Sequence, residues 1–373
     1  MKIKQKLRNK KDHFVITLYK DIRKKLRIDD SSIIILKINN HKLIRIPNKD
    51  FHITIPKKII KNKDNKIEIL EIHNKNNTKL RDKFLFKGDY TNISAFIPEK
   101  TIYGNDIHII DQKNYIYMWY SIGGGVKPLK IKKIIELEKL SELLGFYFGD
   151  GSTTYSLRSF RLTNCEPSAL NYCLNILEDM GIFRTQVKIQ IIYSSNKKID
   201  NKTRKRCINY WSKELKINKK RIISVNRSKN KRETLNYGSA RIFINNSNLT
   251  ELFIHGFLKK FIQIIKNPKS KKEENILRGF LRGLATAEGW VDLTKKKSLS
   301  RIGLAFNPHS EDLELYKKLL NNLNINFGKR HNNGLPITGI NNFKILYELE
   351  LFKMHKKRND KFLLGYKNHK FSN

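Results

Sequence analysis

The sequence predicts an α+β protein built from two similar halves, and three observations lead to that prediction. Two nine-residue segments share one pattern, LLGFYFGDG at Leu143–Gly151 and LRGLATAEG at Leu281–Gly289. Their apolar residues recur at helical spacing, so both segments predict helices. Stretches of alternating polar and apolar residues follow each segment and predict strands. The order of helices and strands after the two segments is therefore similar.

The two segments predict helices that pack closely and end side by side. Aligned, Gly145 corresponds to Gly283, and Gly149 corresponds to Ala287. Small residues four apart lie on one helical face and let two backbones approach, so we expect these four in the helix interface. The glycine that closes each segment suits a left-handed residue after a helix C-terminus. Two arginines four apart are expected on the wetter face of the second helix, Arg278 and Arg282.

An acid precedes the closing glycine of each segment, Asp150 in the first and Glu288 in the second. A carboxylate in the last turn of a helix lies against the negative end of the helix dipole. Two carboxylates ~4 Å apart repel each other by about 4 kcal/mol at an effective dielectric near 20. Mg²⁺, which binds carboxylate and phosphate oxygens together, would offset both effects. The alternative is a pair of solvated helix ends, and the repetition of the pattern favours the cation site.

The elements expected after the first segment form an alternating series. We expect a strand at Tyr155–Thr163, a helix at Pro167–Met180 ended by Gly181, a short helix at Asn209–Ile217 and a strand at Ala240–Ile244. The clearest alternation of the chain runs from 184 to 191, with polar residues on one face and Val187, Ile189 and Ile191 on the other. Such a polar face suits reading of a DNA groove, and a merely solvated sheet face is the alternative. The basic runs 202–206 and 229–232 read as solvated loops, and contact with a phosphate backbone is the alternative.

The second segment is followed by a comparable series. Strands are expected at Trp290–Thr294 and Ser300–Phe306, joined by the basic turn 295–297. Ser310 is the expected cap of a helix that runs through Leu323. A hairpin around 332–334 should then join strands at Phe327–His331 and Pro336–Ile340. A helix from Asn341 to Met354 and a basic tail complete the chain.

The two segments resemble the repeated motif of the LAGLIDADG homing endonucleases of the single-chain type, over about Ile131–Asn373. The resemblance implies two pseudo-symmetric αββαββα halves, 131–265 and 266–373, which form one saddle-shaped antiparallel sheet over DNA. It also implies that Asp150 and Glu288 are the catalytic metal ligands, with the backbone carbonyls of Gly149 and Ala287 close to the same ions. The motif's sixth position, acidic in the family, is Phe148 and Thr286 here, and the second acid is Glu in place of Asp.

Basic and polar residues on the expected strands and turns form the candidate DNA-binding set. Arg and Lys suit guanine edges and phosphates, and Gln suits adenine. In the first half the set is Arg158, Arg161, Arg184, Gln186, Lys188, Gln190 and Arg241; in the second half it is Lys295, Lys297, Arg301, Lys329 and Arg330. The family also uses basic or polar side chains beside its metals, and we assign none of them by position.

The composition independently indicates an acidic partner. Lys and Arg total 76 against 34 Asp and Glu, which gives a net charge of +42. Phosphate neutralisation rewards many dispersed cations, so nucleic acid is the first candidate, and a biased genome is the alternative. We expect no membrane span and no signal peptide, because no apolar run approaches ~20 residues. Three cysteines without a CxxC pair suggest reduced thiols and a cytoplasmic location.

The first 80 or so residues contain a fainter repeat. Ile16–Ile22 matches Ile53–Ile59, and Ile33–Ile38 matches Ile67–Ile72. Each copy predicts strand, short basic helix, strand, which resembles the swapped-hairpin DNA-binding domain of AbrB-like prokaryotic regulators; a generic small β domain is the alternative. Residues 81–130 are expected to be a linker or β extension, with strands at Phe84–Ile97 and Tyr115–Tyr120 and a glycine hinge at 123–125.

Together these features predict a Mg²⁺-dependent, site-specific double-strand DNA endonuclease of the homing type. We expect Mn²⁺ to substitute, no small-molecule cofactor, and a monomer that acts as a pseudo-dimer. Because the first residue is Met1 and not a splicing nucleophile, we expect a freestanding or intron-encoded enzyme from an archaeal or other prokaryotic host. The alternatives are a non-catalytic DNA-binding regulator and an RNA-binding intron maturase.

Overall fold

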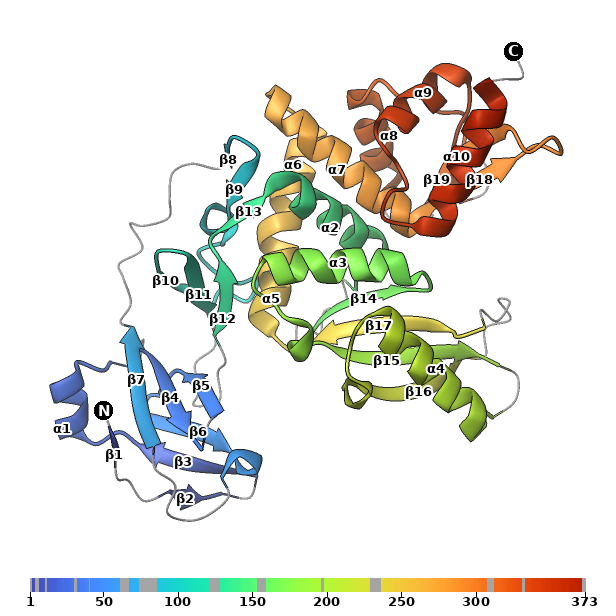
Figure 1. The fold of residues 1–373 in the computed structure, drawn as a ribbon. Coiled ribbons are helices and arrows are strands. Elements are labelled where there is room, and N and C mark those ends of the chain that lie inside the picture. The colour runs from blue at the N-terminus through green and yellow to red at the C-terminus, as the bar shows by residue number, and fades with distance from the viewer. Residues whose placement is uncertain are drawn as a thin grey trace. The chain divides into compact units, whose positions relative to one another are not determined.

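The structure, a computed structural model, describes residues 2–3, 7–10, 12–29, 32–39, 41–60, 67–73, 86–120, 128–152, 159–195, 198–228, 236–306, 312–330 and 333–370. The chain divides into two compact units (Figure 1). Unit 1 comprises Met1–Lys83 and Ile93–Lys133, and unit 2 comprises Phe84–Asn92 and Ile134–Asn373. Unit 1 thus includes most of the segment expected as a linker, and unit 2 holds both motif helices.

Unit 1 is mainly β-structure. One antiparallel sheet has the order β1-β7-β4-β5, and its strands are β1 (Lys2–Ile3), β7 (Ile67–His73), β4 (Ile33–Ile38) and β5 (His41–Arg45). A second has the order β2-β3-β6, from β2 (Arg8–Asn9), β3 (His13–Thr17) and β6 (His52–Pro56). A third has the order β10-β11-β12, from β10 (His108–Asp111), β11 (Tyr115–Trp119) and β12 (Leu129–Lys132). The helical pieces are α1 (Lys20–Leu26), η1 (Lys57–Ile59) and η3 (Ile93–Phe96).

The repeat in unit 1 places equivalent strands beside each other. The first strands of the two copies pair antiparallel, with Ile16 opposite Ile53. The second strands also pair antiparallel, with Ile34 opposite Ile72. Each copy therefore gives one strand to each of two sheets, and their isoleucines form one core cluster. The order strand, helix, strand is confirmed for both copies, although the second helix is the single turn η1.

The first part of unit 2 begins with a small antiparallel sheet and the first motif helix. The sheet has the order β13-β9-β8, from β13 (Ile134–Glu136), β9 (Tyr90–Asn92) and β8 (Phe86–Lys87). After it come α2 (Leu137–Asp150), β14 (Phe160–Asn164), α3 (Pro167–Asp179), η4 (Arg184–Gln186), β15 (Lys188–Ser194), α4 (Asn201–Glu214), η5 (Lys219–Arg221), β16 (Ile222–Ser228) and β17 (Ser239–Ile244). A continuous helical stretch ends this part, from α5 (Ser247–Glu251) through the π-helix η6 (Leu252–Leu258) to α6 (Lys259–Lys266).

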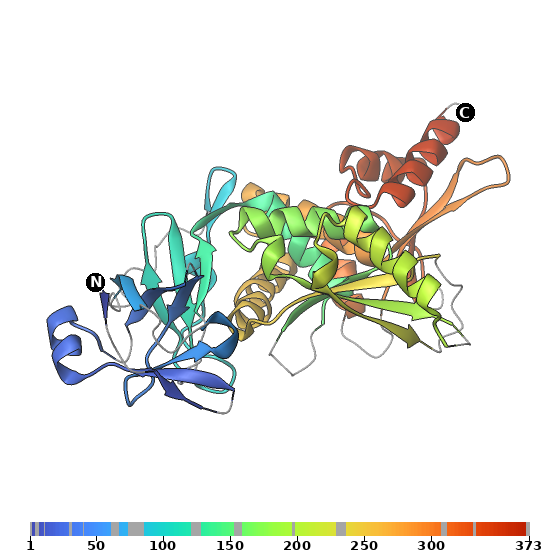
Figure 2. The same ribbon diagram turned by 60° about the horizontal axis from the view of Figure 1, so that its bottom comes forward.

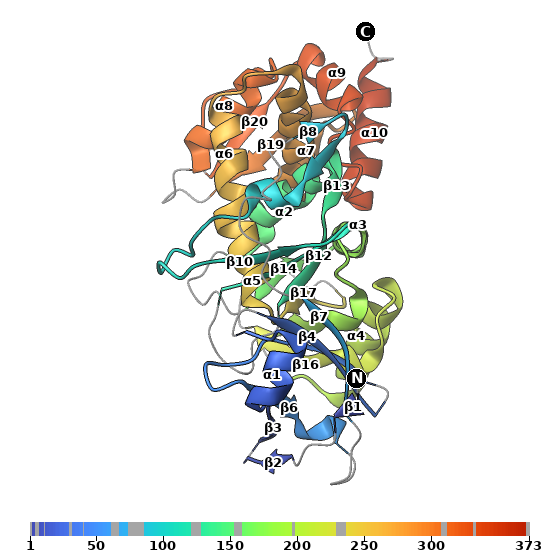
Figure 3. The same cartoon turned by 90° about the vertical axis from the view of Figure 1, so that its left-hand side faces the viewer.

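The second part of unit 2 contains the second motif helix and a separate sheet. Its elements are α7 (Lys271–Glu288), β18 (Gly289–Leu293), β19 (Leu299–Ala305), α8 (Asp312–Asn322), β20 (Gly334–Ile337), α9 (Ile340–Glu348) and α10 (Lys356–Lys370). The strands form an antiparallel sheet of order β18-β19-β20. Helices α2 and α7 lie side by side at the centre of the unit (Figure 1, Figure 3). None of the helices in the described residues combines the length and the hydrophobicity of a membrane-spanning segment.

The α+β class is confirmed, but the sheet of unit 2 differs from the expected one. The strands that follow the two motif helices form two separate sheets, one after each helix, and no single sheet of the described residues spans both halves. In the first half the order is β14-β17-β15-β16, and β15 pairs with β16 in parallel. The connection between β15 and β16 contains α4, and such a crossover allows the two strands to run parallel. A hairpin connection would make them antiparallel. Helices α3 and α4 cover one face of this sheet (Figure 2).

Several element boundaries also differ from the predictions. Of the strand expected at 155–163, the structure shows β14 at Phe160–Asn164, and residues 153–158 lie outside the described residues. The helix expected at 209–217 begins at Asn201, so the run 202–206 is helical and not a loop. Residues 327–330 form no strand, although the Gly328 N–H donates to the Pro336 carbonyl at 2.8 Å. The expected last helix ends at Glu348, and the basic tail is the further helix α10.

Some expectations cannot be compared with the structure because they fall outside the described residues. These are the Ser310 cap, the centre of the hairpin at 332, the glycines 123–125 and the basic run 229–232. Other elements are confirmed within a residue or two: α3 with Gly181 at φ 89°, β11, β17, β18 and β19.

Candidate functional site

The two motif helices touch through their backbones, and glycines make this approach possible. A Cβ placed on Gly145 would lie 2.0 Å from the carbonyl oxygen of Phe280. A Cβ on Gly283 would lie equally close, 2.0 Å, to the carbonyl oxygen of Glu142. Because real carbon and oxygen atoms do not approach this far, neither position accepts a side chain without separating the helices. The helix interface therefore depends on both glycines.

The close approach continues to the helix ends and brings the two acids together. A Cβ on Gly149 would lie 2.6 Å from the Ala287 Cβ and 2.9 Å from the Glu288 Cγ. Glu288 thus packs against the last turn of α2, which ends at Asp150. Both acids are half-buried. The structure therefore places two carboxylates side by side where two helix C-termini meet.

The surroundings of Asp150 disfavour its charged form. Burial raises the pKa of Asp150 to about 7, and the charge of Glu288 acts in the same direction. The Asn164 amide opposes this shift, because its Nδ2 donates to Asp150 Oδ2 at 2.5 Å. Asn164 is itself fixed, since its Oδ1 accepts from the backbone N–H of Glu166 at 2.7 Å. Asp150 is therefore an acid whose ionised form needs a neighbouring cation.

Arg358 of α10 is a cation that interacts electrostatically with Asp150. Its Nη1 donates to three backbone carbonyls at the end of α7, those of Ala285 at 3.1 Å, Thr286 at 2.5 Å and Ala287 at 3.4 Å. Burial lowers the pKa of Arg358, and the charges of Asp150 and Glu288 oppose that shift. A guanidinium at a helix C-terminus satisfies carbonyls that lack helical partners and stabilises the dipole. The sequence does not single out Arg358, because the whole chain contains 76 Lys and Arg residues and the segment around Arg358 is predicted as a basic tail.

His355 fixes the start of the helix that carries Arg358. The His355 Nδ1 accepts from the backbone N–H of Arg358 at 3.2 Å, which is the geometry of an N-cap. Burial lowers the pKa of His355 to about 3, and the charge of Arg358 acts in the same direction. The ring is therefore neutral at ordinary pH, as its acceptor role requires.

A second, buried ionic cluster lies between α2 and α7 further from the helix C-termini. Glu142 of α2 is fully buried, and its Oε1 lies 2.7 Å from Arg282 Nε and 2.8 Å from Lys353 Nζ. The Arg282 contact is an ion pair that is not aligned as a hydrogen bond. The Tyr172 hydroxyl donates to Glu142 Oε2 at 2.6 Å. The expectation that Arg282 lies on a wet face is wrong, because it neutralises this buried carboxylate; Arg278 is exposed and pairs with Glu274.

The closing glycines differ from the expected left-handed caps. Gly151 has φ −82° and ψ 159°, and Gly289 has φ −76° and ψ 155°, which is extended backbone. The chain passes directly from each helix into a β-bridge or strand, so no left-handed residue is needed. Glycine is instead required for space, because a Cβ would lie 2.1 Å from the Tyr147 carbonyl at the first position and 2.3 Å from the Ala285 carbonyl at the second.

The predicted DNA-contacting residues of the first half divide into two groups. Arg161, Lys188, Gln190 and Arg241 lie on one face of the sheet, and we call this set the polar sheet face. Its rows are in register, with Arg241 opposite both Thr163 and Gln190 on the neighbouring strands. The Arg241 Nε donates to Thr163 Oγ1 at 3.2 Å. The opposite face, which includes Ile189, Ile191 and Ile242, is buried. Arg158 lies outside the described residues.

The placement of Arg184 and Gln186 on this face is wrong. Both belong to the turn η4 before the strand begins. Arg184 forms an ion pair with Glu178 and donates from Nε to the Leu215 carbonyl at 3.1 Å. The Gln186 Oε1 accepts from the Phe183 N–H at 2.9 Å. Both side chains therefore hold the turn and its neighbouring helices together.

In the second half, the predicted contacts lie on exposed turns and a strand. Lys295 and Lys297 are exposed in the turn between β18 and β19. Arg301 of β19 pairs with Asp292 at 2.6 Å across the ladder. Lys329 and Arg330 are exposed, and the Arg330 guanidinium lies 5.1 Å from the ring centroid of Phe306.

The donor set beside Asp150 and Glu288 suits a hard cation better than a soft one. The described residues contain no group of three or more His, Cys, Asp and Glu side chains that could hold a metal ion, so protein side chains alone supply only the two carboxylates here. Two carboxylates and helix-end carbonyls are oxygen ligands, which Mg²⁺ completes with water and phosphate oxygens. A divalent ion beside Asp150 would favour the ionised carboxylate and so lower its raised pKa.

No protein-family model and no curated protein matches this chain. Among solved structures, full-length DUF199/WhiA from Thermatoga maritima is similar at 18% identity with a TM-score of 0.35, over 61% of this chain and 59% of that one. The N-terminal LAGLIDADG domain of DUF199/WhiA is similar at 17% identity and 0.32, over 59% and 85%. I-DmoI in complex with DNA and Ca is similar at 16% identity and 0.34, over 60% and 96%.

Proposed function

We propose that the chain is a metal-dependent, site-specific double-strand DNA endonuclease of the homing type. The observation that carries the proposal is the meeting of Asp150 and Glu288 at the ends of two backbone-packed helices. One acid from each half serves one DNA strand, so a single chain acts as a pseudo-dimer. The expected location is the cytoplasm, where the DNA of a prokaryotic host lies.

The ligands in this proposal are the carboxylates of Asp150 and Glu288 and the carbonyl oxygens of Gly149 and Ala287. A bound Mg²⁺, or Mn²⁺ in its place, supplies an activated water and stabilises the leaving oxygen of the phosphodiester. Asn164 orients the Asp150 carboxylate through its hydrogen bond. Arg358 holds the end of α7, and thereby the backbone on which Glu288 is carried. These two residues position the acids and do not react.

DNA contact is assigned to the polar sheet face and to the exposed cations of the second half. Arg and Gln on a strand suit base edges, while dispersed lysines suit phosphates. The net charge of +42 supports a polyanionic partner of considerable length. Lys295, Lys297, Arg301, Lys329 and Arg330 are the proposed contacts of the second half, because all lie on or beside its strands.

A non-catalytic DNA-binding regulator is the second candidate, and one observation favours it. Arg358 already provides a cation within electrostatic reach of both acids. In a protein whose two acids serve only helix packing, a permanent cation such as Arg358 is needed to neutralise them. A nuclease instead needs space beside the acids for a metal ion. The interleaved repeat of unit 1, which resembles AbrB-like DNA-binding domains, suits either candidate.

The test is cleavage of selected duplexes. Duplexes retained by the full chain from a randomised pool are cloned into a plasmid, and linearisation is followed with and without Mg²⁺. The endonuclease proposal expects linearisation by the native chain and its loss in Asp150→Asn and Glu288→Gln, with duplex binding retained. Glu314→Gln is the matched control, because it removes an exposed carboxylate of α8 that pairs with Lys317. Metal-independent binding without cutting by the native chain would favour the regulator.

A further inference from the structure

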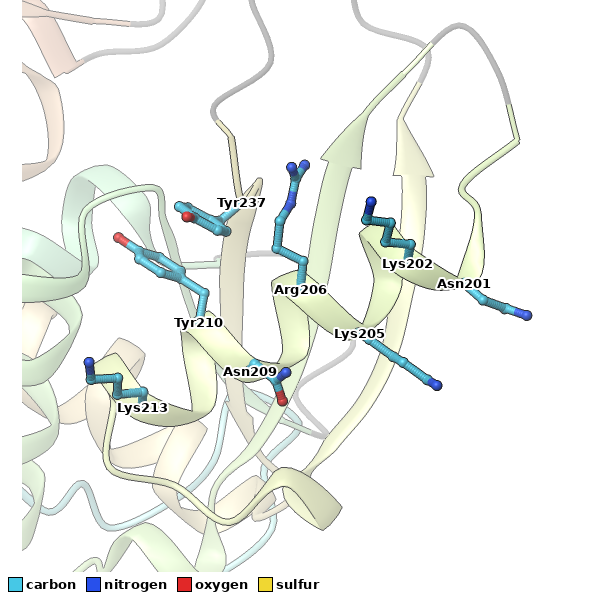
Figure 4. Close-up of a pocket in the computed structure, with 8 residues that line it drawn as sticks. All are labelled: Asn201, Lys202, Lys205, Arg206, Asn209, Tyr210, Lys213 and Tyr237. Carbon is cyan, nitrogen blue, oxygen red and sulfur yellow. The ribbon is translucent and has the colours of Figure 1, made fainter.

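Helix α4 carries a groove that the proposed cleavage reaction does not use. The groove has a volume of about 740 Å³ and lies between α4 and the start of β17 (Figure 4). Its lining is basic and aromatic, and we call it the α4 groove; the side chains that matter are Lys202, Lys205, Arg206, Tyr210, Lys213 and Tyr237. Lys202, Arg206, Tyr210 and Lys213 are spaced by four, four and three residues on α4 and share one helical face, and Lys205 lies at the edge of that face.

In the described part of the chain, the cations of the α4 groove, Lys202, Lys205, Arg206 and Lys213, form no ion pair. Asp200 interacts electrostatically with Arg206, and its carboxylate also accepts from the backbone N–H of Thr203 as the helix cap. The three lysines are exposed. A cluster of like charges on one helix face repels itself, and a bound polyanion would remove that repulsion.

Aromatic rings lie among these cations in a fixed arrangement. The Tyr210 and Tyr237 rings stack with centroids 3.8 Å apart and an interplanar angle of 7°. The Arg206 guanidinium lies 5.7 Å from the centroid of Tyr237 and donates to the Asn236 carbonyl at 3.2 Å. The Tyr237 carbonyl accepts from the buried Trp211 Nε1 at 2.9 Å, which anchors the segment to α4. Flat rings and a guanidinium fixed beside lysines form a surface for stacking bases.

The α4 groove lies on the side of the sheet opposite the polar sheet face. The inner face of α4, with Cys207 and Trp211, is buried, and α4 covers one face of the sheet (Figure 2). The polar sheet face points the other way, because strand residues alternate between faces. A duplex lying along the polar sheet face would therefore leave the α4 groove accessible.

From these observations we infer that the α4 groove binds single-stranded nucleic acid. Lys202, Lys205 and Lys213 contact successive phosphates, and bases stack against the tyrosine pair and Arg206. A rigid duplex presents its bases only as edges, so it could use the lysines but not the rings. The inference stands apart from cleavage, because none of these residues belongs to the proposed metal site.

The test measures binding of labelled oligonucleotides of about 12 nucleotides to the full chain by fluorescence anisotropy. One arm uses oligo-dT, a second uses oligo-U, and a third uses a duplex of the same length. The charge variant is Lys202→Gln/Lys205→Gln/Lys213→Gln. Its matched control is Lys259→Gln/Lys260→Gln/Lys266→Gln, which removes the same charge from exposed positions on α6.

We expect the α4 charge variant to weaken single-strand binding about tenfold and to lower the salt slope by about 2, since each lost phosphate contact removes roughly 0.7. The α6 control should change binding by less than about threefold. Equal weakening by both variants, or by neither, would overturn the inference. The tighter of the two single-strand arms identifies DNA or RNA as the ligand.

The aromatic part of the inference is tested separately. Tyr210→Leu should weaken single-strand binding about tenfold and leave duplex binding unchanged, because only stacking is lost. Tyr347→Leu is its control, since Tyr347 also stacks on a tyrosine, Tyr366, at 4.3 Å. An equal effect of both substitutions would contradict the assignment. Plasmid cleavage by the same proteins is scored alongside, so absence of cutting and absence of single-strand binding remain distinct results.

Discussion

Gly283 provides the sharpest test of the helix interface. In Gly283→Ala the new Cβ would lie 2.0 Å from the Glu142 carbonyl oxygen and 2.6 Å from the Phe146 nitrogen, both of which are backbone atoms. Relief requires α2 and α7 to separate by about 1 Å, and a gap of that size forfeits a quarter to a half of the dispersion energy of each contact. Such overpacking destabilises by about 3 kcal/mol or more, and the better helix propensity of Ala returns about 1 kcal/mol.

The control is Gly365→Ala on α10. Its Cβ would also be crowded, at 2.5 Å, but by the Leu293 Cδ2, the end of a side chain that can move. We expect urea unfolding to show a loss of at least about 2 kcal/mol for Gly283→Ala and a change within about 1 kcal/mol for Gly365→Ala. Equal stability of the two variants would refute the conclusion that the backbones of α2 and α7 are in contact.

Three further predictions concern α10 and the turn before β15. Arg358→Met should lower the free energy of unfolding by about 2 kcal/mol, because charged hydrogen bonds to the end of α7 are lost; thermal unfolding checks this, and an unchanged midpoint would contradict it. His355 has a pKa below that of an unfolded histidine, so the native state binds fewer protons and stability falls as pH drops below about 6.5. Between pH 6.5 and 5 we expect His355 to contribute a loss of about 2 kcal/mol, absent in His355→Gln; denaturant titrations with the same pH slope in both proteins would exclude this origin. Arg184→Gln should destabilise the fold by about 1 to 3 kcal/mol but change duplex affinity by less than about twofold, since its guanidinium is engaged by Glu178; a large loss of affinity at unchanged stability would restore Arg184 to the DNA-contacting set.

The sequence predicted those elements whose boundaries carry local signals. Helix α3 begins with Pro167 at its first position and is followed by Gly181 in a left-handed conformation, and both residues are visible in the sequence. The motif helices were predicted because small residues recur at the same spacing in both. In each case the residue type is required by the backbone itself.

The elements that the sequence predicts only in part, or not at all, lack an apolar pattern. Helix α4 contributes only Cys207 and Trp211 to the core, so the sequence predicts its second half and reads its basic first turns as a loop. Helix α10 is anchored chiefly by Phe362 and by polar contacts such as Arg358, which no periodicity reveals. The predicted polar strand face wrongly includes Arg184 and Gln186, because the alternation of polar and apolar residues already starts at Arg184. The pairing of β15 begins only at Lys188.

The sequence predicts the two acids of the site but not the two residues that contact or position them. Asp150 and Glu288 belong to a repeated motif, whereas Asn164 and Arg358 reach the same place from β14 and α10. Their positions depend on how strands and helices pack around the motif pair. A single sequence contains no record of that packing.

The central claim is that Asp150 and Glu288 jointly bind divalent cations. The most direct measurement is Mn²⁺ binding to the full chain with duplex DNA, followed by electron paramagnetic resonance, for the native chain, Asp150→Asn, Glu288→Gln and Glu314→Gln. We predict that each motif substitution weakens binding at least about tenfold, because a carboxylate ligand is lost, and that Glu314→Gln leaves it unchanged. Equal Mn²⁺ binding by all four proteins would contradict the claim.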